Sequence, residues 1–80
     1  MRPKLVTVEP LEGYKLRLSY DNGECRIYDC TGFINEPVFA PLKNKVVFGT
    51  AKKIRIDSGV EFCNGIDICP DDLYYGSIAV

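Results

Sequence analysis

The chain contains no histidine and no tryptophan. Without histidine, all Ser–His and Cys–His nucleophile pairs are excluded, and so is the commonest general base of enzymes. The sequence also lacks the glycine-rich patterns GxGxxG and GxxxxGK[ST] that cradle phosphate groups. These absences argue against an enzyme, so we expect no catalytic residues and no cofactor.

Long apolar segments are absent as well. No stretch reaches the roughly 20 apolar residues of a membrane span, and the opening MRPKLVTVEP shows no signal-peptide pattern. We therefore expect a cytoplasmic protein without membrane contact, whose cysteines stay reduced. The formal net charge of −1 does not require nucleic acid as a partner. With 80 residues, 46% hydrophobic and 26% charged, the chain fits one globular domain, residues 1–80.

The four cysteines do not fit a metal site. Four residues separate Cys25 from Cys30, and five separate Cys63 from Cys69, whereas structural zinc sites favour two to four. On continuous strands we expect Cys25 in the core, Cys30 facing the opposite way and Cys63 outside the core. We therefore favour small apolar thiols over metal ligands and expect no metal.

The stretch YKLRLSYDNGECRIYD predicts a β-hairpin. Asn22-Gly23 is typical of a two-residue type I′ loop, which would place Tyr20 opposite Cys25 and Leu18 opposite Ile27. The predicted register puts these residues on one apolar face: Leu16, Leu18, Tyr20, Cys25 and Ile27.

A second hairpin is predicted in AKKIRIDSGVEFC. A three-residue loop at residues 57–59 would place Ile56 opposite Val60 and Ile54 opposite Phe62, which unites the apolar residues. The same register pairs Arg55 with Glu61.

Short helical turns are expected between and after the hairpins. Prolines break any long helix in the middle of the chain, so we expect one or two short helices within residues 37–48, ended by Gly49. Near the C-terminus, Asn64-Gly65 predicts a turn, and Pro70 followed by two aspartates is typical of a helix start rather than of catalytic acids. The fold class is therefore α+β, an antiparallel sheet built from hairpins.

Two residues near the C-terminus have no structural role in this scheme. Asp67 lies between two isoleucines, and Cys63 is predicted to be exposed. As candidate interaction residues we take the following: Asn64, Gly65, Asp67, Tyr74 and Cys63. A competing candidate is a basic, nucleic-acid-binding face formed by Lys52, Lys53 and Arg55. We favour the simpler interpretation of these residues, a solvated sheet face that also deters edge aggregation.

The patterns YxLxLxYDNGE, LxNxxxF and FCNGIDICPDxLY resemble a family of small bacterial proteins catalogued as domain of unknown function 2442. The resemblance covers roughly residues 5–75; Phe62 and Cys63 stand where the family often has Trp-Pro. It implies an α+β fold and supplies no catalytic residues. It also implies a genetic arrangement resembling a toxin–antitoxin pair, since family genes often lie beside one encoding a second uncharacterised domain.

These observations favour a non-enzymatic protein-interaction module, in specific form the antitoxin-like half of such a pair. The expected partner is a protein, with the product of the adjacent gene as the first candidate. A homodimer formed through a sheet edge is an open alternative. The competing function is a weak nucleic-acid-binding regulator that uses the basic face.

Overall fold

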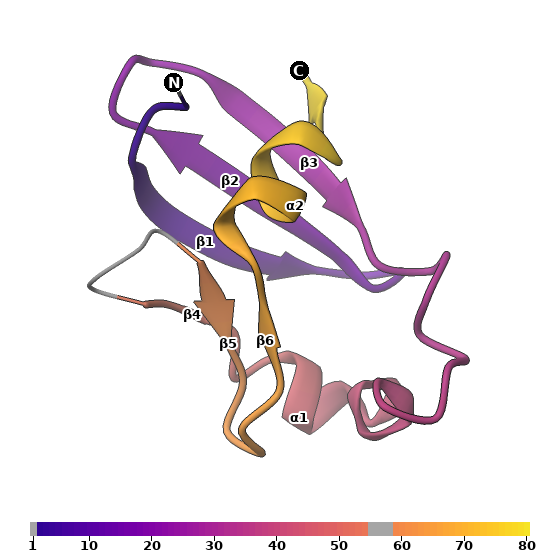
Figure 1. Ribbon diagram of the computed structural model, residues 1–80. Coiled ribbons are helices and arrows are strands. Elements are labelled where there is room, and N and C mark those ends of the chain that lie inside the picture. Colours follow the sequence, from indigo (N-terminus) through magenta and orange to yellow (C-terminus); the bar gives the residue numbers. More distant parts are fainter. Residues whose placement is uncertain (1, 55–58) are drawn as a thin grey trace.

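The computed structural model describes residues 2–54 and 59–80. Seven strands and three short helices follow one another along this part of the chain (Figure 1). Their bounds are β1 Leu5–Leu11, β2 Lys15–Tyr20, β3 Cys25–Asp29, the 3₁₀ helix η1 Ala40–Lys43, α1 Lys45–Phe48, β4 Lys52–Lys53, β5 Val60–Glu61, β6 Asp67–Ile68, α2 Pro70–Tyr75 and β7 Ile78–Ala79. The α+β class with antiparallel sheets is confirmed.

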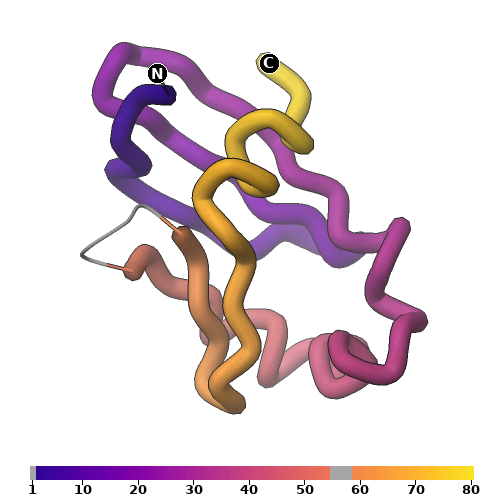
Figure 2. Tube along the Cα trace, in the orientation of Figure 1, coloured from indigo at the N-terminus to yellow at the C-terminus, as the bar shows by residue number. Residues whose placement is uncertain are grey.

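The strands form two antiparallel sheets that share one core. The larger sheet has the order β1-β2-β3-β7, and the smaller has the order β4-β5-β6. After β3 the chain makes a long connection through η1 and α1 to the second sheet, and only the last strand returns to β3 (Figure 2). No helix in the described ranges is long and apolar enough to cross a bilayer.

The loop of the first hairpin has three residues, not the predicted two. Tyr20 N–H donates to the Glu24 carbonyl at 2.9 Å, and Gly23 N–H donates to the Tyr20 carbonyl at 3.1 Å. A type I′ loop needs positive φ at both central residues. Here Gly23 has a φ of 89°, whereas the φ of Asn22 is not positive. Asn22 instead uses its side-chain oxygen to accept the Glu24 N–H at 3.0 Å, so it closes the loop by another route.

This extra loop residue shifts the register of β3 by one residue relative to the prediction, so the two faces of the strand are exchanged. Leu16 lies opposite Tyr28 and Leu18 lies opposite Arg26, so Tyr28 and Arg26 share the buried face of the leucines. The predicted placement of Cys25 and Ile27 on that face is wrong: they pair with Ser19 and Arg17 on the other side. A shift of one residue exchanges all side chains of a strand between its two faces.

The predicted helical turns of the middle segment are confirmed as η1 and α1, and Gly49 ends the second of them. Asn44 caps α1 because its side chain accepts the N–H groups of Val46 and Val47 at 2.9 and 3.5 Å. Each helix supplies one fully or nearly fully buried side chain, Leu42 and Phe48.

The register of the second hairpin also differs from the prediction. Lys52 lies opposite Glu61 and Lys53 opposite Val60, while Ile54 N–H donates to the Gly59 carbonyl at 2.8 Å. The predicted pairing of Ile54 with Phe62 is therefore wrong, and so are the predicted partners of Glu61 and Val60, since these residues pair with Lys52 and Lys53. Residues 55–58 lie outside the described residues, and with them the predicted position of Arg55 and most of the predicted loop.

The Asn64-Gly65 turn is confirmed, and it repeats the first loop. Phe62 N–H donates to the Ile66 carbonyl at 2.9 Å, and Gly65, with a φ of 87°, donates back to Phe62 at 3.1 Å. Asn64 accepts the Ile66 N–H on its side-chain oxygen at 3.2 Å. An aromatic core residue followed by any residue, Asn and Gly thus builds the same loop twice.

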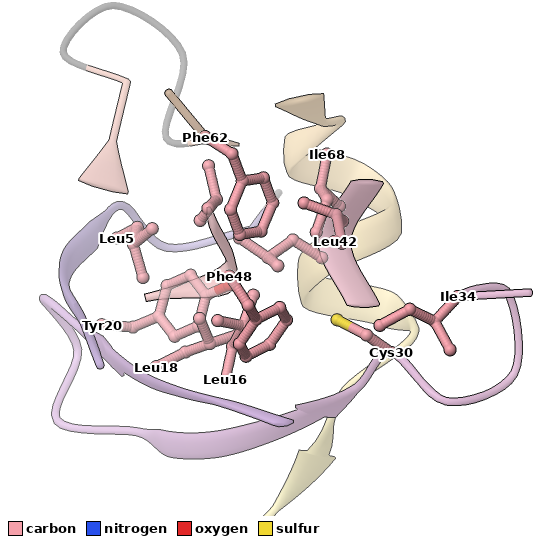
Figure 3. Close-up of a cluster of buried hydrophobic side chains, with 12 residues drawn as sticks. Leu5, Leu16, Leu18, Tyr20, Cys30, Ile34, Leu42, Phe48, Phe62 and Ile68 are labelled. Atoms are coloured by element: carbon pink, nitrogen blue, oxygen red, sulfur yellow. The ribbon is translucent and has the colours of Figure 1, made fainter. Parts of the chain in front are cut away.

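The predicted helix start at Pro70 is confirmed as α2. Leu73 of this helix is fully buried, and it packs into the common core that Figure 3 shows. The members of that core come from both sheets, all three helices and the segment after β3: Leu5, Leu16, Leu18, Tyr20, Cys30, Ile34, Leu42, Phe48, Val60, Phe62, Ile68 and Leu73.

Cys30 corrects another prediction. It has no exposed surface and points into the core beside Ile34 (Figure 3), although alternation along a continuous strand predicts the opposite for it. That prediction counted from a buried Cys25, whereas the observed register puts Arg26 and Tyr28 on the buried face, and Cys30 is the next residue on that face. The Cys30 N–H donates to the Tyr14 carbonyl at 2.9 Å, so the pairing with the neighbouring strand continues past Asp29. Asp29 accepts the N–H and hydroxyl of Thr31 at 2.9 and 2.7 Å, which turns the chain here.

Candidate functional site

The two described lysines of the predicted basic face do not form one face. Lys52 and Lys53 are both exposed, but they are successive residues of β4, so their side chains leave the strand on opposite sides. The Lys52 ammonium lies 3.5 Å from the Glu61 carboxylate. The third member, Arg55, lies outside the described residues.

Tyr74 belongs to a network that holds α2 on the first hairpin. Its hydroxyl donates to the Glu24 carboxylate at 2.6 Å, and its ring packs edge-on against Tyr20 with centroids 5.0 Å apart. The Arg26 guanidinium stacks over the Tyr74 ring at 4.5 Å and reaches Glu24 at 2.7 Å. Arg26 also donates to the Ser77 hydroxyl at 2.6 Å and its carbonyl at 3.0 Å.

Hydrogen bonding in this network shifts two pKa values in opposite directions. The hydrogen bond from Tyr74 to the Glu24 carboxylate raises the pKa of Tyr74. The pKa of Glu24 is lowered, first by the Asn22 side chain and then by Tyr74. Tyr74 thus joins elements of the fold, and its predicted role as an interaction residue is not needed to explain it.

The candidate residues Cys63, Asn64 and Gly65 form the tip of the β5–β6 hairpin. Asn64 and Gly65 build the loop itself, as described above. The backbone N–H of Cys63 donates to the Thr50 hydroxyl at 2.9 Å, which tethers the loop close to the end of α1. The Cys63 side chain is exposed, as predicted.

Asp67 lies in a cleft of about 390 Å³. The cleft lies between β6 with the start of α2 on one side and the connection after β3 on the other. In chain order, η1, α1, β4 and β5 separate these two segments. Its lining comprises Tyr28, Phe33, Glu36, Phe39, Asp67, Ile68, Cys69 and Asp72.

One wall of the cleft is aromatic. The centroids of Tyr28 and Phe33 lie 6.0 Å apart, and those of Phe33 and Phe39 lie 4.5 Å apart, so the three rings form a continuous row. All three side chains are half-buried. Burial raises the pKa of Tyr28 to about 12, with smaller contributions from Cys30 and the nearby Asp72 charge, so its phenol stays neutral.

The rim of the cleft is acidic. Glu36, Asp67 and Asp72 are exposed, and within the described ranges none of their carboxylates forms an ion pair or a side-chain hydrogen bond. Asp67 also lies directly opposite Glu61 across β5 and β6, an unfavourable like-charge pairing. Among the residues that the structure describes, no lysine or arginine lines the cleft.

Sequence reasoning singles out Asp67 but not the rest of this cleft. Asp72 counts there as part of a helix start, and the aromatic residues are not connected with Asp67. No sequence signal joins them, because residues 28–39 and 67–72 meet only through the packing of the second sheet and α2.

A second, smaller hollow of about 260 Å³ lies between the β1–β2 loop and α1. Tyr14 lines it and has a φ of 58°, a strained value for a residue with a side chain. Its hydroxyl donates to the Lys43 carbonyl, and its ring packs edge-on against Phe48 at 5.4 Å. These contacts explain Tyr14 as an anchor between the hairpin and the helices.

Comparison with known proteins identifies a family for this chain. No curated protein matches the chain, and no solved structure does either. Residues 5–79 match a family described as a protein of unknown function, DUF2442, which agrees with the resemblance noted in the sequence. Because the match spans nearly the whole chain, this chain belongs to the DUF2442 family.

Proposed function

We propose that this chain is a non-enzymatic protein-interaction module that receives an extended segment of a partner protein in the cleft beside β6. The observation that carries the proposal is the combination of an aromatic wall with a strand edge. β6 is the last strand of the order β4-β5-β6, and no further strand pairs with it in the part of the chain that the structure describes. An extended peptide can add to such an edge through backbone hydrogen bonds and place alternate side chains in the cleft.

The chemistry of the buried titratable groups supports a non-enzymatic role. Burial raises the pKa of Tyr20, Tyr28 and Cys30 to about 12 in each case, so all three stay protonated at neutral pH. An activated nucleophile needs the opposite shift.

In its specific form, the proposal makes the chain the antitoxin-like half of a toxin–antitoxin-type pair. Its support is the genetic arrangement that the family resemblance implies. The first partner to test is therefore the product of the adjacent gene. Nucleic acid is the weaker alternative, because Lys52 is paired with Glu61 and Lys53 leaves β4 on the other side.

Two exposed cysteines provide a matched test of the cleft. Cys69 lines it, whereas Cys63 lies at the hairpin tip outside it. The adjacent gene product is titrated by calorimetry into wild type, Cys69→Tyr and Cys63→Tyr. We expect a well-defined complex that Cys69→Tyr weakens at least tenfold (about 1.4 kcal/mol), with Cys63→Tyr within about twofold of wild type.

Two results would contradict the proposal. One is the lack of any complex with this gene product, together with salt-sensitive retention of DNA or RNA by the chain, which would favour the nucleic-acid alternative. The other is a complex that Cys69→Tyr leaves unchanged, which would move the interface away from the cleft.

A further inference from the structure

The surroundings of Arg26 show which features of this fold bind an arginine side chain. The Arg26 guanidinium lies 4.5 Å from the centroid of the Tyr74 ring and 2.7 Å from a Glu24 carboxylate oxygen. An aromatic face and a carboxylate within reach of the same guanidinium are the two features that stabilise it, by cation–π attraction and by charge-assisted hydrogen bonds.

The cleft beside β6 presents the same two features, and none of the described residues that line it is cationic. Its wall is the row of Tyr28, Phe33 and Phe39, and its rim carries three exposed carboxylates. The next residue along α2 shows the contrast: the carboxylate of Asp71 is paired with Arg2 at 3.0 Å, whereas that of Asp72 has no cationic partner among the described residues.

The spread of the carboxylates argues against a metal ion. Across residues 2–54 and 59–80, no group of three acidic, cysteine or histidine side chains is placed to hold one. A bound metal ion needs several oxygen ligands within about 2.0–2.6 Å, and a row of aromatic rings supplies none. A flat organic cation suits the cleft better, because it can stack on a ring while its edge reaches separate carboxylates.

We infer that the cleft is an arginine-recognition site: it binds an arginine side chain of the partner segment, stacked on the aromatic wall and paired with Glu36, Asp67 and Asp72. This inference rests on the proposed function, since it names the chemistry of the segment that the same cleft receives. It favours arginine over lysine because an ammonium group neither stacks as a plane nor forms paired parallel hydrogen bonds.

A set of capped heptapeptides tests the inference without knowledge of the natural partner. The reference peptide carries arginine at its central position between valine and serine residues. In two matched peptides this arginine is replaced by lysine, or by citrulline, which keeps the shape and removes the charge. Binding is measured by calorimetry and by the rate at which a maleimide alkylates Cys69, with Cys63 as the internal reference in the same sample, read by mass spectrometry.

We expect the arginine peptide to bind and to slow alkylation of Cys69 while Cys63 reacts at its usual rate. The citrulline peptide should bind at least tenfold more weakly and the lysine peptide several-fold more weakly. The charge-neutralising variants Asp67→Asn and Asp72→Asn should each weaken binding of the arginine peptide by about twofold to fivefold, as for exposed ion pairs. Asp71→Asn makes the same change in net charge outside the cleft and should leave binding unchanged.

Other outcomes would overturn the inference, and they differ in whether the proposed function survives. If arginine and citrulline peptides bind equally and both protect Cys69, the cleft receives peptides but does not select arginine, so the proposed function survives. If Asp71→Asn weakens binding as much as Asp72→Asn, the attraction is to overall charge and not to the cleft. If no peptide binds or protects Cys69, arginine recognition is refuted, while the titration with the adjacent gene product still decides the proposed function separately.

Discussion

Burial of the Cys30 thiol predicts that the fold weakens at moderately alkaline pH. The thiol has no exposed surface, and burial, assisted by the neighbouring charge of Asp29, raises its pKa from 9.0 to about 12. In the unfolded chain the same thiol ionises near its ordinary pKa. Because the pKa is raised only in the folded state, the stability that the buried neutral thiol contributes is fully present below about pH 9. This stability is lost as the pH rises from 9 towards 12.

The size of the loss follows from proton linkage. Between about pH 8 and about pH 10, a single group with these two pKa values lowers the free energy of unfolding by about 1.4 kcal/mol. The buried phenols of Tyr20 and Tyr28 add smaller losses, because their ordinary pKa of 10.0 places most of their effect at higher pH. For a domain of this size, about 1.4 kcal/mol is a substantial fraction of the total stability.

Urea unfolding of wild type and two variants at about pH 8, 9 and 10, under reducing conditions, isolates the thiol. Cys30→Ala should be less stable at all three pH values because of the cavity it leaves, yet its stability should fall by about 1.4 kcal/mol less than that of wild type between pH 8 and 10. Cys63→Ala removes an exposed cysteine and should keep the wild-type pH dependence. Parallel curves for wild type and Cys30→Ala would refute the reasoning.

Four further substitutions test packing and backbone geometry. Gly76→Ala should lower the free energy of unfolding by about 1–3 kcal/mol, because its Cβ would lie 2.6 Å from the Asp72 carbonyl oxygen; a neutral result in urea unfolding would contradict this. Gly65→Ala should cost about 1–2 kcal/mol through its φ of 87°, while Gly32→Ala, with no positive φ and no atom within 4 Å of the added Cβ, should stay within about 0.5 kcal/mol. Leu73→Ala should cost about 2–5 kcal/mol by thermal or urea unfolding, since the side chain is fully buried, and native-like stability would show that α2 does not depend on it.

Local signals in the sequence predict the elements of this fold well. Pro70 with its following aspartates marks the start of α2, Gly49 the end of α1, and Asn64-Gly65 a turn. Each of these features depends on residues within one or two turns of the chain, so its physical cause is visible in the local sequence.

Strand register is predicted less well, because it depends on loop conformation and on partners distant in sequence. Asn22-Gly23 is compatible with both a two-residue and a three-residue loop, and the choice decides whether Arg26 or Cys25 faces α2. The half-buried position of Arg26 is favourable only because Tyr74 and Ser77, about 50 residues further along the chain, lie beside it. Pattern reasoning that places apolar residues inside and charged residues outside therefore selects the wrong register.

The candidate site shows the same limit. Asp67 stands out in the sequence as an acid between isoleucines. The aromatic wall that completes the cleft beside it comes from residues 28–39, which are distant in sequence. Its partners become visible only once the second sheet and α2 are packed against the connection after β3.

The loops at Asn22-Gly23 and Asn64-Gly65 should tolerate amino-acid substitutions at their first position but not changes in loop length. The first position of each loop, Asp21 or Cys63, is exposed. Changes of the Cys63 side chain should have little effect, and changes of Asp21 should cost only the exposed hydrogen bond that its carboxylate accepts from the Lys4 N–H at 3.0 Å. A change in length at the same position is different, since deleting Asp21 would exchange the two faces of β3 and expel Tyr28 from the cleft wall. Within the family, variation at these tips should therefore consist of substitutions at constant length, as strictly as if the residues lay in the core.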